Sequence, residues 1–325
     1  MKYVNFPFAV GADGTQLLRP TTGVDARFLF YALHTSELEQ FGYQRHFKLL
    51  KDCEIPTPTL RLQLRIASIL GAFDDLIEVN RRRVVVLEEM ARGLFEEWFV
   101  RFRFVGHESV PMLDTPDGPL PLGWRWGTAA DLIEFDPRTR VSAAGEKPFI
   151  PMGHLDTQTS LIAKHELRDG NSGAKFQNDD TLFARITPCL ENGKTGLVRN
   201  LTSPDGTGFG STEFIVMRGR EAGPAFTYCL ARHEAFRSAA RGSMTGTSGR
   251  QRARTESVAA FSLPVPPSKE LLDAFELTTW PMLQLVGALG QAVDQLAASR
   301  DLLLPRLISG QLSVASADRQ LAEVA

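Results

Sequence analysis

The stretch FDDLIEVNRRRVVVLEEMARGLFEEWFV, residues 73–100, decides the fold that we expect for this chain. It contains no proline and continues an apolar pattern that begins near residue 60. The pattern alternates steps of four and three residues, which is typical of a coiled-coil seam. The sequence therefore predicts a long helix over residues 60–99, which needs a partner helix to cover its apolar side. The positions of the pattern are Leu62, Ile66, Ile69, Phe73, Leu76, Asn80, Leu87, Met90 and Leu94.

A second run with the same spacing lies near the C-terminal end and is the expected partner. Two prolines interrupt it, and proline lacks the N–H that a helix interior needs. Pro281 predicts a kink or a helix start near residue 281, and Pro305 predicts a bend or an end. The positions of the run are Phe275, Thr279, Met282, Val286, Leu289, Val293, Leu296, Arg300, Leu303 and Leu307.

The sequence between the two runs has a different character. Short apolar pieces (FIPMG, TLFARI, GLVRNL and EFIVMR) alternate with Gly, Pro and Asn, which indicates short strands. Residues 225–240 form a helix candidate. Together with the strands, this helix predicts an α+β domain over residues 124–261. The segments EIPTP (54–58) and LPVPP (263–267), with weaker matches upstream of each, occur in the same order and indicate an internal duplication. Residues 1–53 match only the last part of such a domain.

Composition excludes several classes of protein. The net charge is −2, so a nucleic-acid surface would need a local concentration of basic residues. Three distant cysteines without a C-x-x-C pair argue against a disulfide framework or a zinc cage and fit a reducing cytoplasm. No apolar run approaches the roughly 20 residues of a membrane span, and no signal-peptide pattern begins the chain.

The sequence also contains no complete signature of the enzyme classes that we considered. The segment ENGKTG (191–196) contains Gly-Lys-Thr, but Pro188 stands where a phosphate-binding loop needs glycine. Asp205 and Glu213 suggest a nuclease carboxylate pair, but no lysine follows Glu213 at the required spacing. The six histidines form no metal-binding cluster. We therefore expect no catalytic centre.

The segment RGSMTGTSGRQRAR (241–254) is the main binding candidate. Glycines let a backbone approach phosphates closely, and Ser, Thr and Arg donate hydrogen bonds to phosphate oxygens. Arg and Gln can also pair with guanine and adenine edges in the major groove. The alternative is a solvated loop whose arginines cap a helix or meet surface carboxylates. Arg138, Arg140, Lys175, Arg185, Lys194 and Arg199 add positive charge to the same domain, although each could be a plain surface residue.

Three further features allow two interpretations each. The segment GFGSTEF (208–214) suits a close backbone approach or a hairpin turn. Asn80 can fix the register and partner of the coiled coil, or it can face outward. The segment WFVRFRF (98–104) holds more aromatic residues than one seam buries, which suggests a docked protein, or equally a core.

The order of these motifs resembles the specificity subunits of type I restriction–modification systems. The matching segments are IPTP with the following helix, LPLGW, LFARITPCLENGKTG, GSTEFIVMR, GTSGRQRA, LPVPP and LLLPRLISGQL. The resemblance implies two target-recognition domains that each read half of a split DNA site, separated by two antiparallel helices. It also implies that these helices dock N6-adenine methyltransferase (M) subunits, which restriction/translocase (R) subunits join.

The expected fold is α+β, with one intact target-recognition domain and a remnant of a second, joined by two long antiparallel coiled-coil helices. The expected ranges are 1–53 (remnant of the first domain), 54–104 (first spacer helix), 105–262 (second domain), 263–313 (second spacer helix) and 314–325 (tail). The first domain lacks about 80 residues, the counterpart of residues 121–200 in the second domain, so we expect a truncated chain. Such a chain would leave FLFYAL (28–33) without apolar neighbours, and two chains could pair through their helices as a homodimer.

The expected function is non-catalytic recognition of double-stranded DNA in the cytoplasm, directing M and R subunits to a target. The alternative is a coiled-coil scaffold that binds a methyltransferase subunit without reading DNA. No cofactor is expected on this chain, because S-adenosylmethionine, ATP and Mg²⁺ would belong to the partners. The candidate partner-binding residues are Asn80, Leu94, Phe95, Trp98 and Phe99. The candidate DNA-binding residues are Arg138, Arg140, Lys175, Arg185, Lys194, Ser211, Thr212, Thr247, Ser248, Arg250, Gln251 and Arg252.

Overall fold

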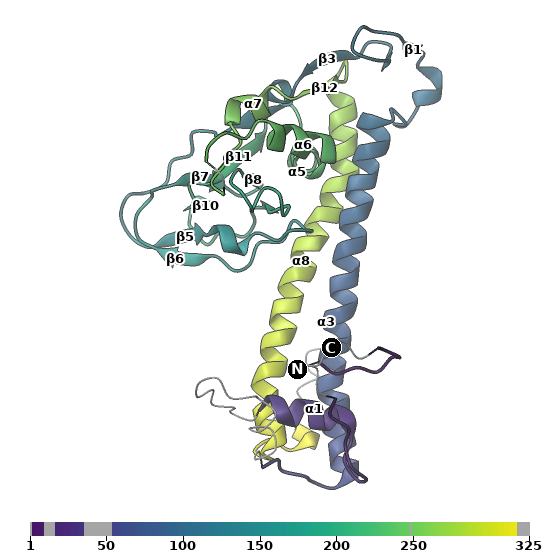
Figure 1. The fold of residues 1–325 in the computed structure, drawn as a ribbon, viewed down its shortest axis with the longest axis vertical. Coiled ribbons are helices and arrows are strands. Elements are labelled where there is room, and N and C mark those ends of the chain that lie inside the picture. The colour runs from purple at the N-terminus through teal and green to yellow at the C-terminus, as the bar shows by residue number, and fades with distance from the viewer. Residues whose placement is uncertain (1, 10–16, 36–53, 248, 317–325) are drawn as a thin grey trace. The chain divides into compact units, whose positions relative to one another are not determined.

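The computed structural model describes residues 2–9, 17–35, 54–247 and 249–316 (Figure 1). The chain divides into two compact units. The helical unit comprises residues 1–81 and 291–325, and the mixed unit comprises residues 82–290. Two long helices, α3 (Leu60–Phe95) and α8 (Lys269–Ile308), contribute residues to both units.

Helix α3 confirms the predicted first helix, and a π-helical turn (Glu96–Val100) continues it. Helix α8 begins twelve residues before the predicted start at residue 281 and continues past both Pro281 and Pro305. Pro281 leaves the carbonyl of Leu277 without its helical donor, and Leu277 is exposed, so water can supply that bond. The apolar contacts on the other side of α8 therefore outweigh the cost of the proline.

The buried stripe of α3 coincides with only part of the predicted seam. Ile66, Ile69 and Phe73 are buried as predicted, but Leu62 and Met90 are exposed. A helix has 3.6 residues per turn, so a strict seven-residue repeat drifts around its surface. The stripe follows that drift and consists mainly of Gln63, Ile66, Leu70, Phe73, Ile77, Val84, Glu88, Ala91 and Phe95.

The two helices are antiparallel in their contacts. In the helical unit, early residues of α3 share a core with late residues of α8, such as Ile66 with Leu307. In the mixed unit, late residues of α3 share a core with early residues of α8, such as Phe95 with Phe275. This confirms the predicted pair of antiparallel helices.

A short helix, α1 (Ala26–His34), packs on both long helices in the helical unit (Figure 1). Phe28 is only 1% exposed and Tyr31 only 2%, against Ile69, Phe73 and Ile308 among others. The segment FLFYAL is therefore not left without apolar neighbours, contrary to the expectation from the sequence, because the long helices supply them. Polar contacts add to this packing, and Tyr31 and Arg300 both hydrogen-bond to Asp74.

The mixed unit contains two four-stranded sheets. The first has the order β6 (Glu166–Arg168), β5 (Lys147–Ile150), β10 (Thr207–Gly210), β7 (Ala174–Gln177), and only its β5–β10 pair is parallel. The second is antiparallel and has the order β4 (Ile133–Phe135), β11 (Phe214–Gly219), β8 (Thr181–Ala184), β9 (Thr195–Leu197). Four of these strands, β5, β8, β9 and β11, confirm the apolar pieces predicted as strands.

Two-stranded pairs and short helices complete the mixed unit. Strand β1 (Met112–Leu113) pairs with β2 (Leu120–Pro121), and β3 (Arg125–Thr128) pairs with β12 (Ser262–Val265). The predicted helix over residues 225–240 is two helices, α5 (Pro224–Arg232) and α6 (Glu234–Gly242), because the backbone at His233 is extended. The remaining helices are α4 (Ala129–Leu132), α7 (Thr255–Ala259) and 3₁₀ turns at His107–Ser109 and Met152–His154.

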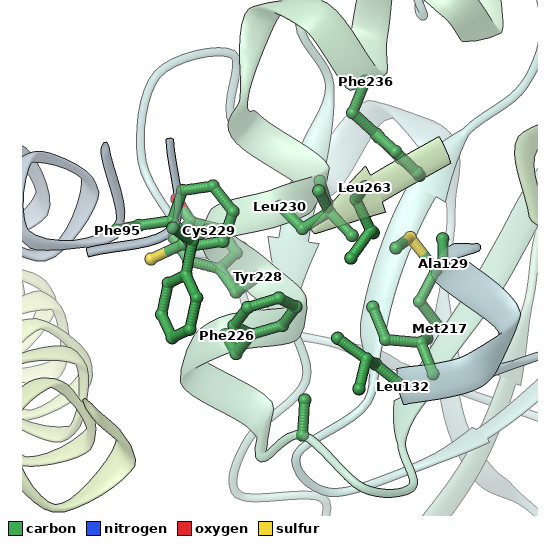
Figure 2. Packing of buried hydrophobic residues seen from close by; sticks show 14 of the residues in the cluster. Phe95, Ala129, Leu132, Met217, Phe226, Tyr228, Cys229, Leu230, Phe236 and Leu263 are labelled. Atoms are coloured by element: carbon green, nitrogen blue, oxygen red, sulfur yellow. The ribbon is translucent and has the colours of Figure 1, made fainter. Parts of the chain in front are cut away.

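Two cores lie on the two faces of the second sheet. Adjacent strand residues point to opposite faces, so Leu182 lies in a core with the first sheet and Phe183 in a core with α5 and α6. The second core continues through α5 to the long helices, where the Phe226 ring centroid lies 5.2 Å from that of Phe95 (Figure 2). Helix α5 therefore joins the sheet to the helices within one core.

Candidate nucleic-acid interface

Backbone hydrogen bonds hold the described residues of the arginine-rich loop, 245–247 and 249–252. Thr245 N–H donates to Arg252 O (3.1 Å), and Arg252 N–H donates to Thr245 O (3.0 Å). Across the tip, Arg250 N–H donates to Thr247 O (3.0 Å). Gly246 and Gly249 have φ values of 128° and 79°, which side chains other than glycine rarely adopt. The glycines of this segment therefore allow the reversal that exposes Arg250.

Residues 185–187, which follow β8, hold the base of this loop. Ala253 N–H donates to Arg185 O (2.8 Å), and the Arg185 Nε–H donates back to Ala253 O (3.2 Å). Thr187 N–H donates to Gln251 O (3.1 Å), and Gln251 N–H donates to the Thr187 hydroxyl (3.2 Å). The loop is thus fixed to the segment that follows β8 mainly by backbone groups, which leaves most of its side chains free for other contacts.

The turn at residues 211–213 also contacts the segment that follows β8. Arg185 N–H donates to Glu213 O (3.0 Å), and Ser211 N–H donates to Ile150 O (3.2 Å). A Cβ at Gly210 would lie 2.4 Å from Ile150 O, so only glycine fits this close approach. The hairpin interpretation of GFGSTEF is wrong, because the strands on either side of the turn, β10 and β11, belong to different sheets.

An ion pair connects the turn with the loop. The Arg252 guanidinium donates from Nε to both Glu213 carboxylate oxygens (3.0 and 2.9 Å) and from Nη2 to Oε1 (2.7 Å). Its Nη1 also donates to Arg250 O (3.3 Å). The hydrogen bonds that Arg252 donates to the Glu213 carboxylate raise the pKa of Arg252, so this guanidinium stays charged. In the sequence, Glu213 suggests only a nuclease carboxylate, and no local pattern pairs it with a residue 39 positions away.

The structure brings together part of the predicted DNA-binding set. Arg250 and Thr247 are exposed at the loop tip, and Thr212 is exposed on the neighbouring turn. Within the described ranges, the Arg250 guanidinium has no hydrogen bond or ion pair, unlike that of Arg252. The predicted residues at this place are Arg185, Ser211, Thr212, Thr247, Arg250, Gln251 and Arg252; Ser248 lies outside the described residues.

Five predicted cations are not joined to this loop by a contact among the residues described. Arg138 and Arg140 are exposed in the segment after β4, and Lys175 is half-buried on β7. The Lys194 ammonium donates to the carbonyls of Met152 (3.0 Å) and Gly153 (3.3 Å), which gives it an internal structural role. Arg199 is mostly buried, and burial lowers its pKa despite the charge of nearby Glu88.

The predicted partner-binding aromatics belong to the core of the mixed unit. Phe95, Trp98 and Phe99 are 4%, 7% and 3% exposed, and their rings contact Phe226 and Phe275. The core interpretation therefore replaces the docking interpretation for these three residues. Leu94 is half-buried against the same core, and Asn80 is half-buried on α3, so a docking role for these two stays a prediction.

A buried carboxylate on α3, which the sequence analysis missed, ties the sheets and α5 to the long helix. Glu88 is fully buried and accepts hydrogen bonds from Ser160 N–H (2.6 Å) and the Tyr228 hydroxyl (2.6 Å). Arg232 in turn donates to the Tyr228 oxygen (3.0 Å). Burial raises the pKa of Tyr228 well above its usual value, so the phenol keeps the proton that it donates to Glu88.

Other kinds of site find little support. Among the residues that the structure describes, no group of His, Cys, Asp and Glu side chains could hold a metal ion. Likewise, no described helix is both long and apolar enough to cross a bilayer.

Comparison with known proteins points to one family. No protein-family model matches the chain. The type I restriction enzyme MjaIX specificity subunit of Methanocaldococcus jannaschii is 24% identical over 328 residues, which cover 93% of this chain and 72% of that subunit. The EcoAI specificity subunit of Escherichia coli is 30% identical over 255 residues, which cover 69% of this chain. This chain is similar in sequence to the type I restriction specificity subunits.

The match to the EcoAI specificity subunit spans only 43% of that subunit. Among solved structures, the type I restriction–modification S subunit of M. genitalium is 14% identical and matches with a TM-score of 0.48, over 88% of this chain and 73% of that one.

Proposed function

We propose that this chain is a non-catalytic DNA-reading subunit of a type I restriction–modification complex in the cytoplasm. The observation that carries the proposal is the loop at residues 245–252. Its base is fixed to the segment that follows β8, its tip exposes Arg250, whose guanidinium has no partner among the described residues, and small hydroxyl residues lie on the adjacent turn. Arginine and hydroxyl donors on a fixed backbone suit both phosphate oxygens and base edges. The sequence similarity to named specificity subunits supports the same function.

Duplex binding should depend on salt and on Arg250. Binding that neutralises phosphates weakens linearly with the logarithm of salt concentration. Arg250→Ala should weaken binding by about 1–3 kcal/mol if the side chain reaches a base, or evenly across sequences if it reaches a phosphate. The measurement is fluorescence anisotropy with a pool of randomised duplexes, followed by selected ones, over a range of salt concentrations.

The matched control for Arg250→Ala is Arg125→Ala. Arg125 is an exposed arginine on β3 of the same unit and is paired with Asp131 at 2.8 Å. Both variants lose one positive charge, but only the first alters the loop. Both should keep the unfolding temperature of the wild type, because neither side chain is buried. If the wild type shows no salt-dependent duplex binding, the chain is a scaffold that does not read DNA.

We further propose that the chain assembles with N6-adenine methyltransferase subunits and then with restriction/translocase subunits. In that assembly the partners would bind S-adenosylmethionine, ATP and Mg²⁺, and this chain would bind no cofactor. Co-expression with a methyltransferase subunit should give a complex that survives size-exclusion chromatography. Elution of the two proteins as separate species would contradict this part of the proposal. A homodimer through the long helices would appear in the same experiment as a doubled mass of the chain alone.

A further inference from the structure

We propose that Glu213 and Arg252 form a positioning clamp that presents Arg250, and that Arg252 does not itself contact DNA. The inference rests on the proposed function, and it changes the role predicted for Arg252 from the sequence. Three donor–acceptor contacts of 2.7–3.0 Å already occupy the Nε and Nη2 face of its guanidinium. Such a face cannot also pair bidentately with a guanine edge or a phosphate unless the ion pair opens.

The backbone on both sides of the ion pair is fixed, so the pair is preorganised. Glu213 N–H donates to the Ser211 hydroxyl (3.2 Å), and Glu213 O accepts from Arg185 N–H (3.0 Å). Arg252 exchanges two backbone hydrogen bonds with Thr245. Neither residue can move far without breaking these bonds. An exposed ion pair contributes little to global stability, so its main effect here is on where the loop lies.

The clamp reaches Arg250 through its carbonyl group. The Nη1 of Arg252 donates to Arg250 O (3.3 Å), while Arg250 N–H donates to Thr247 O (3.0 Å). Both polar groups of the Arg250 backbone are therefore held, and its exposed side chain carries the unpaired charge of the loop tip. Glu213 thus decides which of the two arginines is available to DNA.

Exchanging the two charges tests the clamp. Arg252→Glu alone should weaken duplex binding more than the control Arg125→Glu, which changes the net charge by the same amount. Combining Arg252→Glu with Glu213→Arg restores an ion pair and should return the affinity to within about threefold of the wild type, with an unchanged salt slope. If Arg252 contacts a phosphate directly, the combined variant should stay as weak as Arg252→Glu, and its salt slope should fall by about one. That result would overturn the clamp.

A second measurement needs no DNA and separates this inference from the proposed function. The rate of backbone amide hydrogen exchange in residues 245–253 should rise about two- to fivefold in Arg252→Glu, which is the effect expected from losing a well-oriented exposed ion pair. Exchange should return toward the wild-type rate in the combined variant. Unchanged exchange in Arg252→Glu would show that the pair does not hold the loop, whether or not the wild type binds DNA. If the wild type does not bind duplex DNA, the proposed function is rejected. The hydrogen-exchange measurement then still decides whether the Glu213–Arg252 ion pair holds the loop.

Discussion

Glu88→Ala is expected to lower the unfolding free energy of the mixed unit by about 3–5 kcal/mol, the usual effect of breaking a buried charged network. The substitution leaves Ser160 N–H and the Tyr228 hydroxyl without an acceptor inside the protein. It also removes a negative charge that interacts favourably with the mostly buried Arg199. Buried donors and charges without partners are costly because they have given up water.

Urea unfolding of the full chain, followed by tryptophan fluorescence, can measure this effect. All four tryptophans lie in residues 82–290, so their fluorescence reports on the mixed unit. Glu89→Ala, an exposed neighbour on α3, is the matched control and should change the unfolding free energy by less than about 0.5 kcal/mol. Glu88→Gln keeps an acceptor oxygen and should fall between the two. Equal losses for Glu88→Ala and Glu89→Ala would contradict the role of the buried carboxylate.

Phe275→Ala should have a comparable effect, about 3–5 kcal/mol, through loss of packing and creation of a cavity. The Phe275 ring is fully buried on α8, and its centroid lies 5.1 Å from that of Phe99 and 5.8 Å from that of Trp98. It therefore joins the end of the first long helix to the start of the second. The same urea titration, followed by far-ultraviolet circular dichroism as well as fluorescence, measures the loss.

Leu277→Ala supplies the control for this substitution. Leu277 lies two residues further along α8 and is 81% exposed, so its truncation opens no cavity. Its unfolding midpoint should match that of the wild type. If Phe275→Ala is no less stable than Leu277→Ala, the aromatic cluster is not the packing centre described here. Trp98 adjoins Phe275, so a change in native fluorescence intensity alone does not count as destabilisation.

The helices and strands could be predicted from the sequence where the pattern is local. The spacing of apolar residues identified α3, and short apolar pieces identified β8 and β11. The same method placed a possible helix start at Pro281, and the structure excludes that start, because the packing that keeps α8 continuous comes from residues far along the chain. It also left the aromatics of residues 98–104 open between a core and a docking surface, since their count alone does not distinguish the two.

The candidate site was predictable in composition but not in geometry. A segment rich in Gly, Ser, Thr and Arg identified the loop that carries Arg250. The roles of Arg252 and Glu88 depend on Glu213 and Tyr228, which are 39 and 140 positions away from them. The fold alone sets such pairings, so no periodicity or motif in this one sequence could reveal them.

The backbone attachment of the loop has a consequence for how binding preferences can diversify. The bonds at its base join main-chain groups of residues 185–187 and 251–253, together with the Arg185 guanidinium and the Thr187 hydroxyl, and none of them uses a side chain at the tip. Substitutions at Thr247 or Arg250 therefore leave the hydrophobic cores untouched, and the unchanged unfolding temperature expected for Arg250→Ala measures this independence. Mutations can thus change the side chains at the tip without a prior gain in stability elsewhere in the protein. We therefore expect this short segment to tolerate variation between related chains.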